Sequence, residues 1–99
     1  MIKHLSKQDN FEEEIKGEKV LVDFFATWCG PCSMLSPVIE DLEKETGIKV
    51  IKVDVDELPA IAQKFRVMSI PTLVLFKDGK PVNVATGYMP LENLRNFVK

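Results

Sequence analysis

Two patterns of apolar residues run through this chain, one typical of buried strands and one of amphipathic helices. Residues 19–26 are apolar at nearly every position, as expected of a strand covered on both faces, and residues 48–54 are predicted as the next strand. Residues 72–76 and 81–85 are two further apolar runs that flank Asp78-Gly79, and this dipeptide between such runs is a strong hairpin signal. The pattern predicts a mixed sheet in which an antiparallel pair joins parallel strands.

The segments between these strands carry helical periodicity. The clearest is 33–45, where apolar residues recur every three or four positions and Gly47 follows as a stop. A helix over 7–16 is predicted from a loose capping pattern and a closing glycine, and shorter helices are predicted over 58–65 and from residue 90 onward. Residues 2–5 are apolar enough for a short edge strand. Alternating strands and helices indicate an α/β fold.

Length and charge narrow the function classes. The chain has 99 residues, enough for one domain over 1–99, with 45% hydrophobic and 28% charged residues. Its net charge of −2 gives no basic field for nucleic acid or an anionic membrane surface. No apolar stretch approaches a membrane span, and the N-terminal residues lack the apolar core of a signal peptide. The sequence therefore predicts a cytoplasmic protein that binds neither nucleic acid nor membranes.

The only two cysteines, Cys29 and Cys32, lie between the strand over 19–26 and the helix over 33–45. Three interpretations compete: a structural disulfide, half of a zinc site, and a redox pair. A disulfide that closes so short a loop stabilises a fold by only about 2 kcal/mol, because little chain entropy is removed. A closed zinc site needs four ligands, and His4 is the only histidine, so one chain cannot supply it. The spacing in a βαβ context favours the redox pair.

The residues around the pair fit redox chemistry. Pro31 suits the first turn of a helix, which places Cys29 at the helix start, where free backbone N–H groups favour the thiolate. Cys29 is thus the predicted nucleophile, exposed at that position. Cys32, one turn further and more buried, is placed to attack a mixed disulfide on Cys29. Gly30 allows the backbone of another chain to approach closely.

Two charged residues interrupt apolar strands. Asp23 is either a carboxylate satisfied at a strand end or a buried acid behind the cysteines, whose pKa burial would raise. Lys52 reads most simply as an edge lysine or one whose ammonium reaches solvent along an apolar stem. The Ile70–Pro71 bond is expected to be trans, since cis X-Pro bonds are about 5–6% of those in folded proteins.

The segment from Phe24 to Cys32, which ends in Trp-Cys-Gly-Pro-Cys, resembles the active-site segment of the thioredoxin family, and the similarity extends over essentially the whole chain. The resemblance implies the thioredoxin fold, a five-stranded mixed β-sheet flanked by four helices, two on each face. It also implies that Asp23 is a buried proton acceptor with Lys52 as its partner, and that the Ile70–Pro71 bond is cis. The implied substrate surface comprises Trp28, Gly30, Pro31, Ile70, Pro71, Gly87 and Tyr88.

The resemblance further implies a monomeric protein-disulfide reductase that uses no metal and no organic cofactor. Its partners would be disulfide-containing proteins and a thioredoxin reductase as electron donor. A thioredoxin-fold scaffold module, and a disulfide oxidase or isomerase, are the alternatives, and the proline between the cysteines favours the reductase. Ser33 and Met68 stand where many relatives carry basic residues, and Phe25 replaces a common tryptophan, so partner preference stays open.

Overall fold

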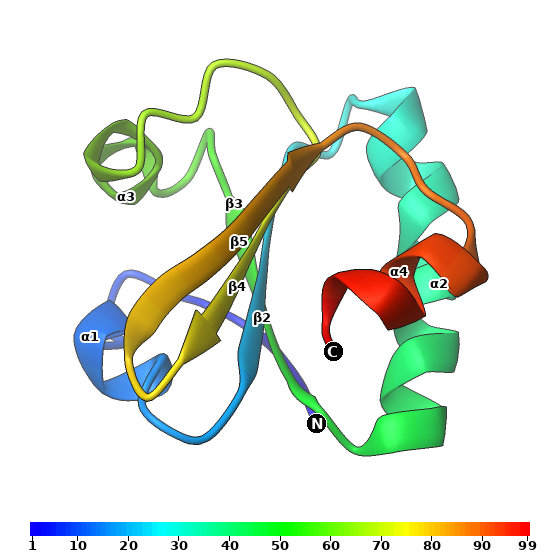
Figure 1. The fold of residues 1–99 in the computed structure, drawn as a ribbon. Coiled ribbons are helices and arrows are strands. Elements are labelled where there is room, and N and C mark those ends of the chain that lie inside the picture. Colours follow the sequence, from blue (N-terminus) through cyan, green and yellow to red (C-terminus); the bar gives the residue numbers. More distant parts are fainter.

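The apolar runs form the five strands of one sheet in the computed structural model, which describes residues 1–99. The strands lie in the order β1-β3-β2-β4-β5 (Figure 1). Their bounds are β1 Ile2–His4, β2 Val20–Phe25, β3 Lys49–Asp54, β4 Thr72–Lys77 and β5 Lys80–Thr86. The short β1 is an edge strand and β2 is the central one, as predicted. Burial on both faces explains why β2 and β3 lack alternating polar residues.

The sheet is mixed. β1, β3 and β2 run parallel, whereas β4 is antiparallel to β2 and to β5. The β4–β5 connection is the predicted tight turn, with Asp78 at φ 52° and Gly79 at φ 79°. Positive φ at both central positions is typical of the hairpin turn that Asp-Gly favours. Residues facing each other across β2 and β3 include Asp23 and Lys52, which are therefore neighbours in the register.

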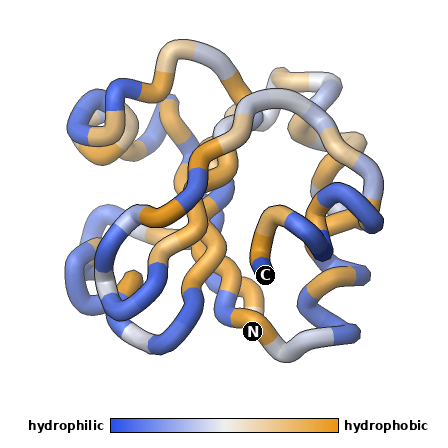
Figure 2. Tube along the Cα trace, viewed as in Figure 1, coloured by the Kyte–Doolittle hydropathy of each residue, from blue (hydrophilic) through white to orange (hydrophobic).

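Two helices cover each face of the sheet, as predicted (Figure 1). α1 (Phe11–Glu14) and α3 (Pro59–Lys64) lie on one face; α2 (Gly30–Thr46) and α4 (Leu91–Phe97) lie on the other. Each pair buries its own apolar cluster against alternate residues of the strands, and the apolar strands run through the middle of the molecule in Figure 2. The α2 side buries Leu21, Leu35, Ile39, Leu42, Val50, Leu73, Leu75 and Leu94.

Helix α2 begins earlier than its apolar periodicity indicated. Cys29 is its N-cap and Pro31 lies in its first turn, where a missing backbone N–H costs nothing. Gly47 ends the helix in the left-handed conformation, at φ 69°, and its N–H donates to the Glu43 carbonyl at 2.8 Å. The helix start, not its apolar stripe, therefore positions the cysteine pair.

The predicted helix over residues 7–16 is wrong in extent, because α1 spans only four residues. The Asp9 carboxylate accepts hydrogen bonds from the backbone N–H and hydroxyl of Ser6, which holds residues 6–9 in a turn outside the helix. Asn10 is the N-cap instead, and its side chain accepts from the Glu13 N–H. Gly17 does not close the helix, since its φ of 134° lies well away from a left-handed cap.

No helix in the structure combines the length and the apolar character that crossing a membrane requires.

Candidate active site

A disulfide joins Cys29 and Cys32 at the carboxyl end of β2, where α2 begins. In open α/β sheets, ligands bind outside the carboxyl ends of the strands, at this edge. The Cys29 sulfur caps the helix: it accepts a hydrogen bond from the Cys32 backbone N–H at 3.2 Å. Free N–H groups and the positive end of the helix dipole therefore face this sulfur, and both favour negative charge on it. Electrostatics thus distinguish Cys29 from Cys32.

Burial does not distinguish them, contrary to the expectation that Cys29 would be exposed and Cys32 buried. Cys29 is 5% exposed and Cys32 is 4% exposed. The loop before β4 is the reason, because it lies against the sulfur: the Ile70 carbonyl oxygen is 3.9 Å from Cys29 Sγ. Ala26 and the partly buried Phe25, Val55 and Ile70 complete the small cluster around the disulfide.

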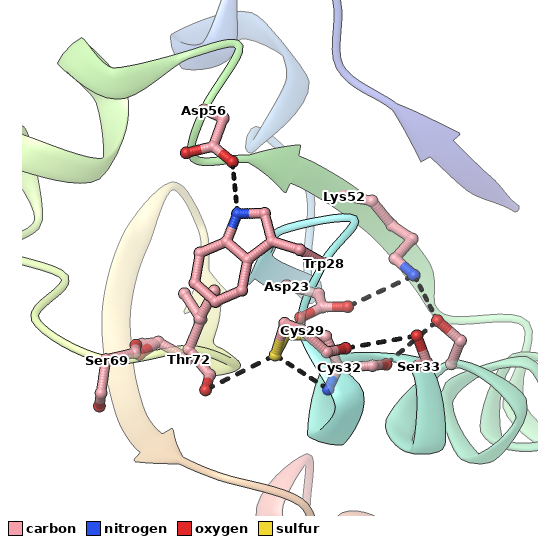
Figure 3. Close-up of a disulfide and its surroundings, with 11 residues drawn as sticks. Asp23, Trp28, Cys29, Cys32, Ser33, Lys52, Asp56, Ser69 and Thr72 are labelled. Atoms are coloured by element: carbon pink, nitrogen blue, oxygen red, sulfur yellow. Dashed lines mark hydrogen bonds and ion pairs between the residues drawn. A yellow bond between two sulfur atoms is a disulfide. The ribbon is translucent and has the colours of Figure 1, made fainter.

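Asp23 and Lys52 form a buried pair on the α2 side of the sheet. Their strand neighbours Leu21 and Val50 pack against α2 and α4, and side chains two apart share a face. Asp23 is fully buried and Lys52 is 8% exposed, and Figure 3 shows Lys52 extended from its strand toward Asp23. Lys52 Nζ lies 3.5 Å from Asp23 Oδ2. Since β3 is an interior strand, the edge-lysine interpretation is wrong.

The desolvation of Asp23 outweighs its attraction to Lys52. No protein group donates a hydrogen bond to either oxygen of Asp23, and 3.5 Å is an ion-pair distance beyond a good N–H···O bond. Burial raises the pKa of Asp23 to about 6, and the attraction of the Lys52 ammonium opposes the rise without cancelling it. A carboxyl with this pKa exchanges its proton close to neutral pH, as a general acid or base must.

Trp28 projects from the same junction and is 72% exposed. Its indole N–H donates to Asp56 Oδ2 at 2.8 Å, which fixes the ring over the turn that follows β3 (Figure 3). Sequence analysis missed Asp56. No pattern in the chain could have indicated it, because the two residues are 28 positions apart and Asp56 belongs to an acidic turn of ordinary composition.

The loop before β4 completes the site. The Ile70–Pro71 bond is cis, as the resemblance implied, and the trans bond expected from the low frequency of cis X-Pro bonds is wrong. The Pro71 carbonyl accepts a hydrogen bond from the Gly87 N–H at 2.8 Å, and Gly87 adopts φ 89°, which favours glycine. Tyr88 follows at 44% exposed. Gly30 and Pro31 are exposed at the start of α2. The structure therefore brings the Ile70–Pro71 loop and the start of α2 together at the disulfide, with Gly87 bonded to that loop and Tyr88 next to Gly87 in the chain.

The structure shows no cluster of metal-ligating side chains. No group of three or more His, Cys, Asp and Glu side chains lies close enough together to hold an ion. The two thiols that a zinc site would use are bonded to each other.

The thioredoxin family model matches residues 2–99. The chain belongs to the thioredoxin family. A thioredoxin of Staphylococcus haemolyticus is 55% identical over 87 residues, which cover 86% of this chain and 84% of that protein. The thioredoxin of Staphylococcus saprophyticus is 51% identical over 92 residues, covering 91% of this chain and 88% of that protein.

Solved thioredoxin-family structures agree on the fold. A single-site mutant of thioredoxin from Halobacterium salinarum superposes with a TM-score of 0.91 at 39% identity, covering 98% of this chain and 87% of that one. Reduced Schistosoma mansoni thioredoxin superposes with a TM-score of 0.89 at 31% identity, covering 98% of this chain and 94% of that one. The predicted fold and family are confirmed. A thioredoxin-family member with this redox-active disulfide is a protein-disulfide reductase, which confirms the predicted activity.

Proposed function

We propose that Cys29 is the attacking thiol and Cys32 the resolving thiol of this thioredoxin-family reductase, with Asp23 as the acceptor of the Cys32 proton. One observation carries the assignment: the Cys29 sulfur is the N-cap of α2 and accepts the Cys32 N–H. A thiolate is stabilised at that position and not at Cys32, which lies inside the first turn.

In the first step the Cys29 thiolate of the reduced protein attacks a disulfide of the target protein. A bond forms between Cys29 Sγ and one target sulfur, the target disulfide breaks, and the other target sulfur leaves as a thiolate that takes up a proton. The Ile70 carbonyl beside Cys29 Sγ supports docking of the target backbone here, and Trp28, directly before Cys29, offers an exposed ring; Tyr88 is a second exposed ring, one residue after Gly87.

In the second step the Cys32 thiol gives its proton to the Asp23 carboxylate. The resulting thiolate attacks Cys29 Sγ, the mixed disulfide breaks, and the second target thiolate leaves. Asp23 then releases the proton it accepted and the second target thiolate takes one up, so the target has gained two electrons and two protons, and the chain holds the Cys29–Cys32 disulfide present in the structure. The raised pKa of Asp23 supports this assignment, since the group can both accept and release a proton near neutral pH.

The cycle closes when a two-electron donor reduces the disulfide again. We propose that this donor is a thioredoxin reductase, that the targets are disulfide-containing proteins, and that the chain works as a monomer whose docking surface stays free. A reducing compartment such as the cytoplasm suits it, because a disulfide reductase needs a steady supply of reduced thiols there.

The test combines trapping with a measurement of reduction potential. Cys32→Ser should accumulate a mixed disulfide with a model target, while Cys29→Ser should not, and the reverse result would overturn the assignment. Asp23→Asn should leave the first step unchanged and slow the second. Equilibration with glutathione should give a potential near that of thioredoxin, about −270 mV, whereas about −120 mV would indicate an oxidase. A chain that forms no mixed disulfide and does not turn over would be a scaffold module.

A further inference from the structure

Ser36 on α2 is the one hydroxyl that contacts the Lys52 ammonium. Ser36 Oγ donates to the Cys32 carbonyl, one turn back along the helix, at 3.4 Å. The same oxygen accepts a hydrogen bond from Lys52 Nζ at 2.8 Å. A hydroxyl has one proton and two lone pairs, so donating to the carbonyl leaves its lone pairs free for the ammonium. Ser36 thus connects the backbone of Cys32 to the buried pair.

The Lys52 ammonium lies closer to Ser36 than to Asp23. It is 2.8 Å from Ser36 Oγ but 3.5 Å from Asp23 Oδ2, and it lies 4.9 Å from the centre of the Phe25 ring. Asp23 is fully buried, yet no protein group donates a hydrogen bond to either of its oxygens. A buried carboxylate without a partner carries a desolvation cost that a direct bond from Lys52 would relieve. The short contact is instead made to Ser36.

We propose that Ser36 is a positioning residue whose hydroxyl holds the Lys52 ammonium at ion-pair distance from Asp23 and prevents a direct hydrogen bond that would weaken Asp23 as a base. Without the hydroxyl, the ammonium needs to move only a few tenths of an ångström to contact Oδ2. The direct bond favours the carboxylate over the carboxylic acid. Ser36 acts through Lys52 and does not touch the reacting sulfurs.

Other charged groups surround Lys52 and must be accounted for. His4 is its register partner on β1, and its ring packs edge-on against Phe25. A cavity of about 250 Å³ beside Cys32 is lined by His4, Ser33, Ser36 and Lys52, so water can reach the ammonium. Further charges line the adjoining cavities: Glu40, Glu43 and Lys44 from α2, and Asp54 and Glu57 at and after the end of β3.

The inference deepens the proposed function and rests on it for its consequence in catalysis. If Asp23 accepts the Cys32 proton, the position of Lys52 sets the pH at which it does so. The geometric part stands on the oxidised protein alone, so it can be tested without turnover. Failure of the geometry and failure of the catalytic assignment therefore give different results.

The test measures the pKa of Asp23 in the oxidised protein by NMR of its side-chain carboxyl carbon across pH 4–9. In Ser36→Ala the pKa should fall by about 0.5–1 unit, the change expected when a unit charge approaches from 3.5 Å to direct hydrogen-bond contact at an effective dielectric constant of about 20. Ser36→Thr keeps the hydroxyl and should restore the original pKa. The single histidine is followed in the same titration, so that its own proton uptake is separated from that of Asp23.

Ser33→Ala is the matched control. Ser33 Oγ also donates one turn back, to the Cys29 carbonyl at 3.3 Å, but no hydrogen bond joins it to Lys52. Its removal should leave the pKa of Asp23 unchanged. An unchanged or raised pKa in Ser36→Ala, or an equal fall in Ser33→Ala, would overturn the inference. A fall in Ser36→Ala with no matching shift in the pH dependence of the second step would support the positioning and contradict the catalytic role of Asp23.

Discussion

Replacing Asp23 by Asn should stabilise the protein at neutral pH and not at acidic pH. The carboxyl is fully buried, without a hydrogen-bond partner, and its pKa is raised from 3.8 to about 6. A carboxyl with a raised folded-state pKa binds more protons in the folded than in the unfolded chain between these two values. The free energy of unfolding therefore falls as pH rises from about 4 to about 6, and stays lower above that range.

The magnitude follows from the shift. One pKa unit corresponds to about 1.4 kcal/mol, so ionised Asp23 costs the fold about 3 kcal/mol at pH 8 relative to pH 3.5. Asn has a similar shape and no charge, and it removes this pH-dependent cost. The Lys52 ammonium faces a neutral side chain in the variant at every pH, as it does in the wild type below the pKa of Asp23, and its attraction to ionised Asp23 is already contained in the pKa of about 6. The stability gain of Asp23→Asn at pH 8 minus its gain at pH 3.5 is therefore a cleaner measure of the cost of ionised Asp23 than the gain at either pH alone.

Urea unfolding of the oxidised wild type and Asp23→Asn, at several pH values from 3.5 to 8, measures this difference. The stability gain of the variant should grow by about 3 kcal/mol across the range, with most of the growth between pH 4 and 6. Asp41→Asn, an exposed carboxylate of α2, is the control and should show no comparable growth. A gain for Asp23→Asn that is equal at all pH values would refute the raised pKa, and so would a loss that grows with pH.

Two further predictions concern the thiols and the core. A limiting alkylating reagent at neutral pH should label Cys29 first in the reduced protein, because its sulfur faces the free N–H groups at the start of α2; peptide mapping checks this, and preferential labelling of Cys32 would contradict it. Leu35→Ala should lower the free energy of unfolding by about 2–5 kcal/mol, since Leu35 is fully buried between α2 and the sheet; a loss well under about 1 kcal/mol in urea unfolding would show that the site collapses around the smaller residue.

The order and type of the elements could be predicted from the sequence because local patterns carried them. A nearly continuous apolar run marked β2, Asp78-Gly79 marked the hairpin, and Gly47 marked the end of α2. Pro31 and the cysteine spacing placed the redox pair at a helix start. Each of these signals depends on neighbouring residues, so it can be recognised without knowledge of the rest of the fold.

The error at α1 shows where local signals compete. Ser6 and Asp9 resembled a helix cap, and they do bond to each other, but in a turn that precedes Asn10. The actual N-cap, Asn10, is another polar residue of the type that caps helices. Phe11, which follows Asn10, packs into the apolar cluster on this face of the sheet, and that contact involves residues far along the chain.

The sequence by itself determined which residues do the chemistry, since the chain holds a single cysteine pair at one strand–helix junction. Tertiary structure decided the environment of each group. It closed the Ile70 loop over Cys29, so that both sulfurs are equally buried, and it brought Asp56 to the Trp28 indole across 28 positions. It also placed the Lys52 ammonium in hydrogen-bond contact with Ser36 and at ion-pair distance from Asp23. These contacts join residues distant in the chain, and distances, desolvation and proton affinity depend on that packing rather than on any local pattern.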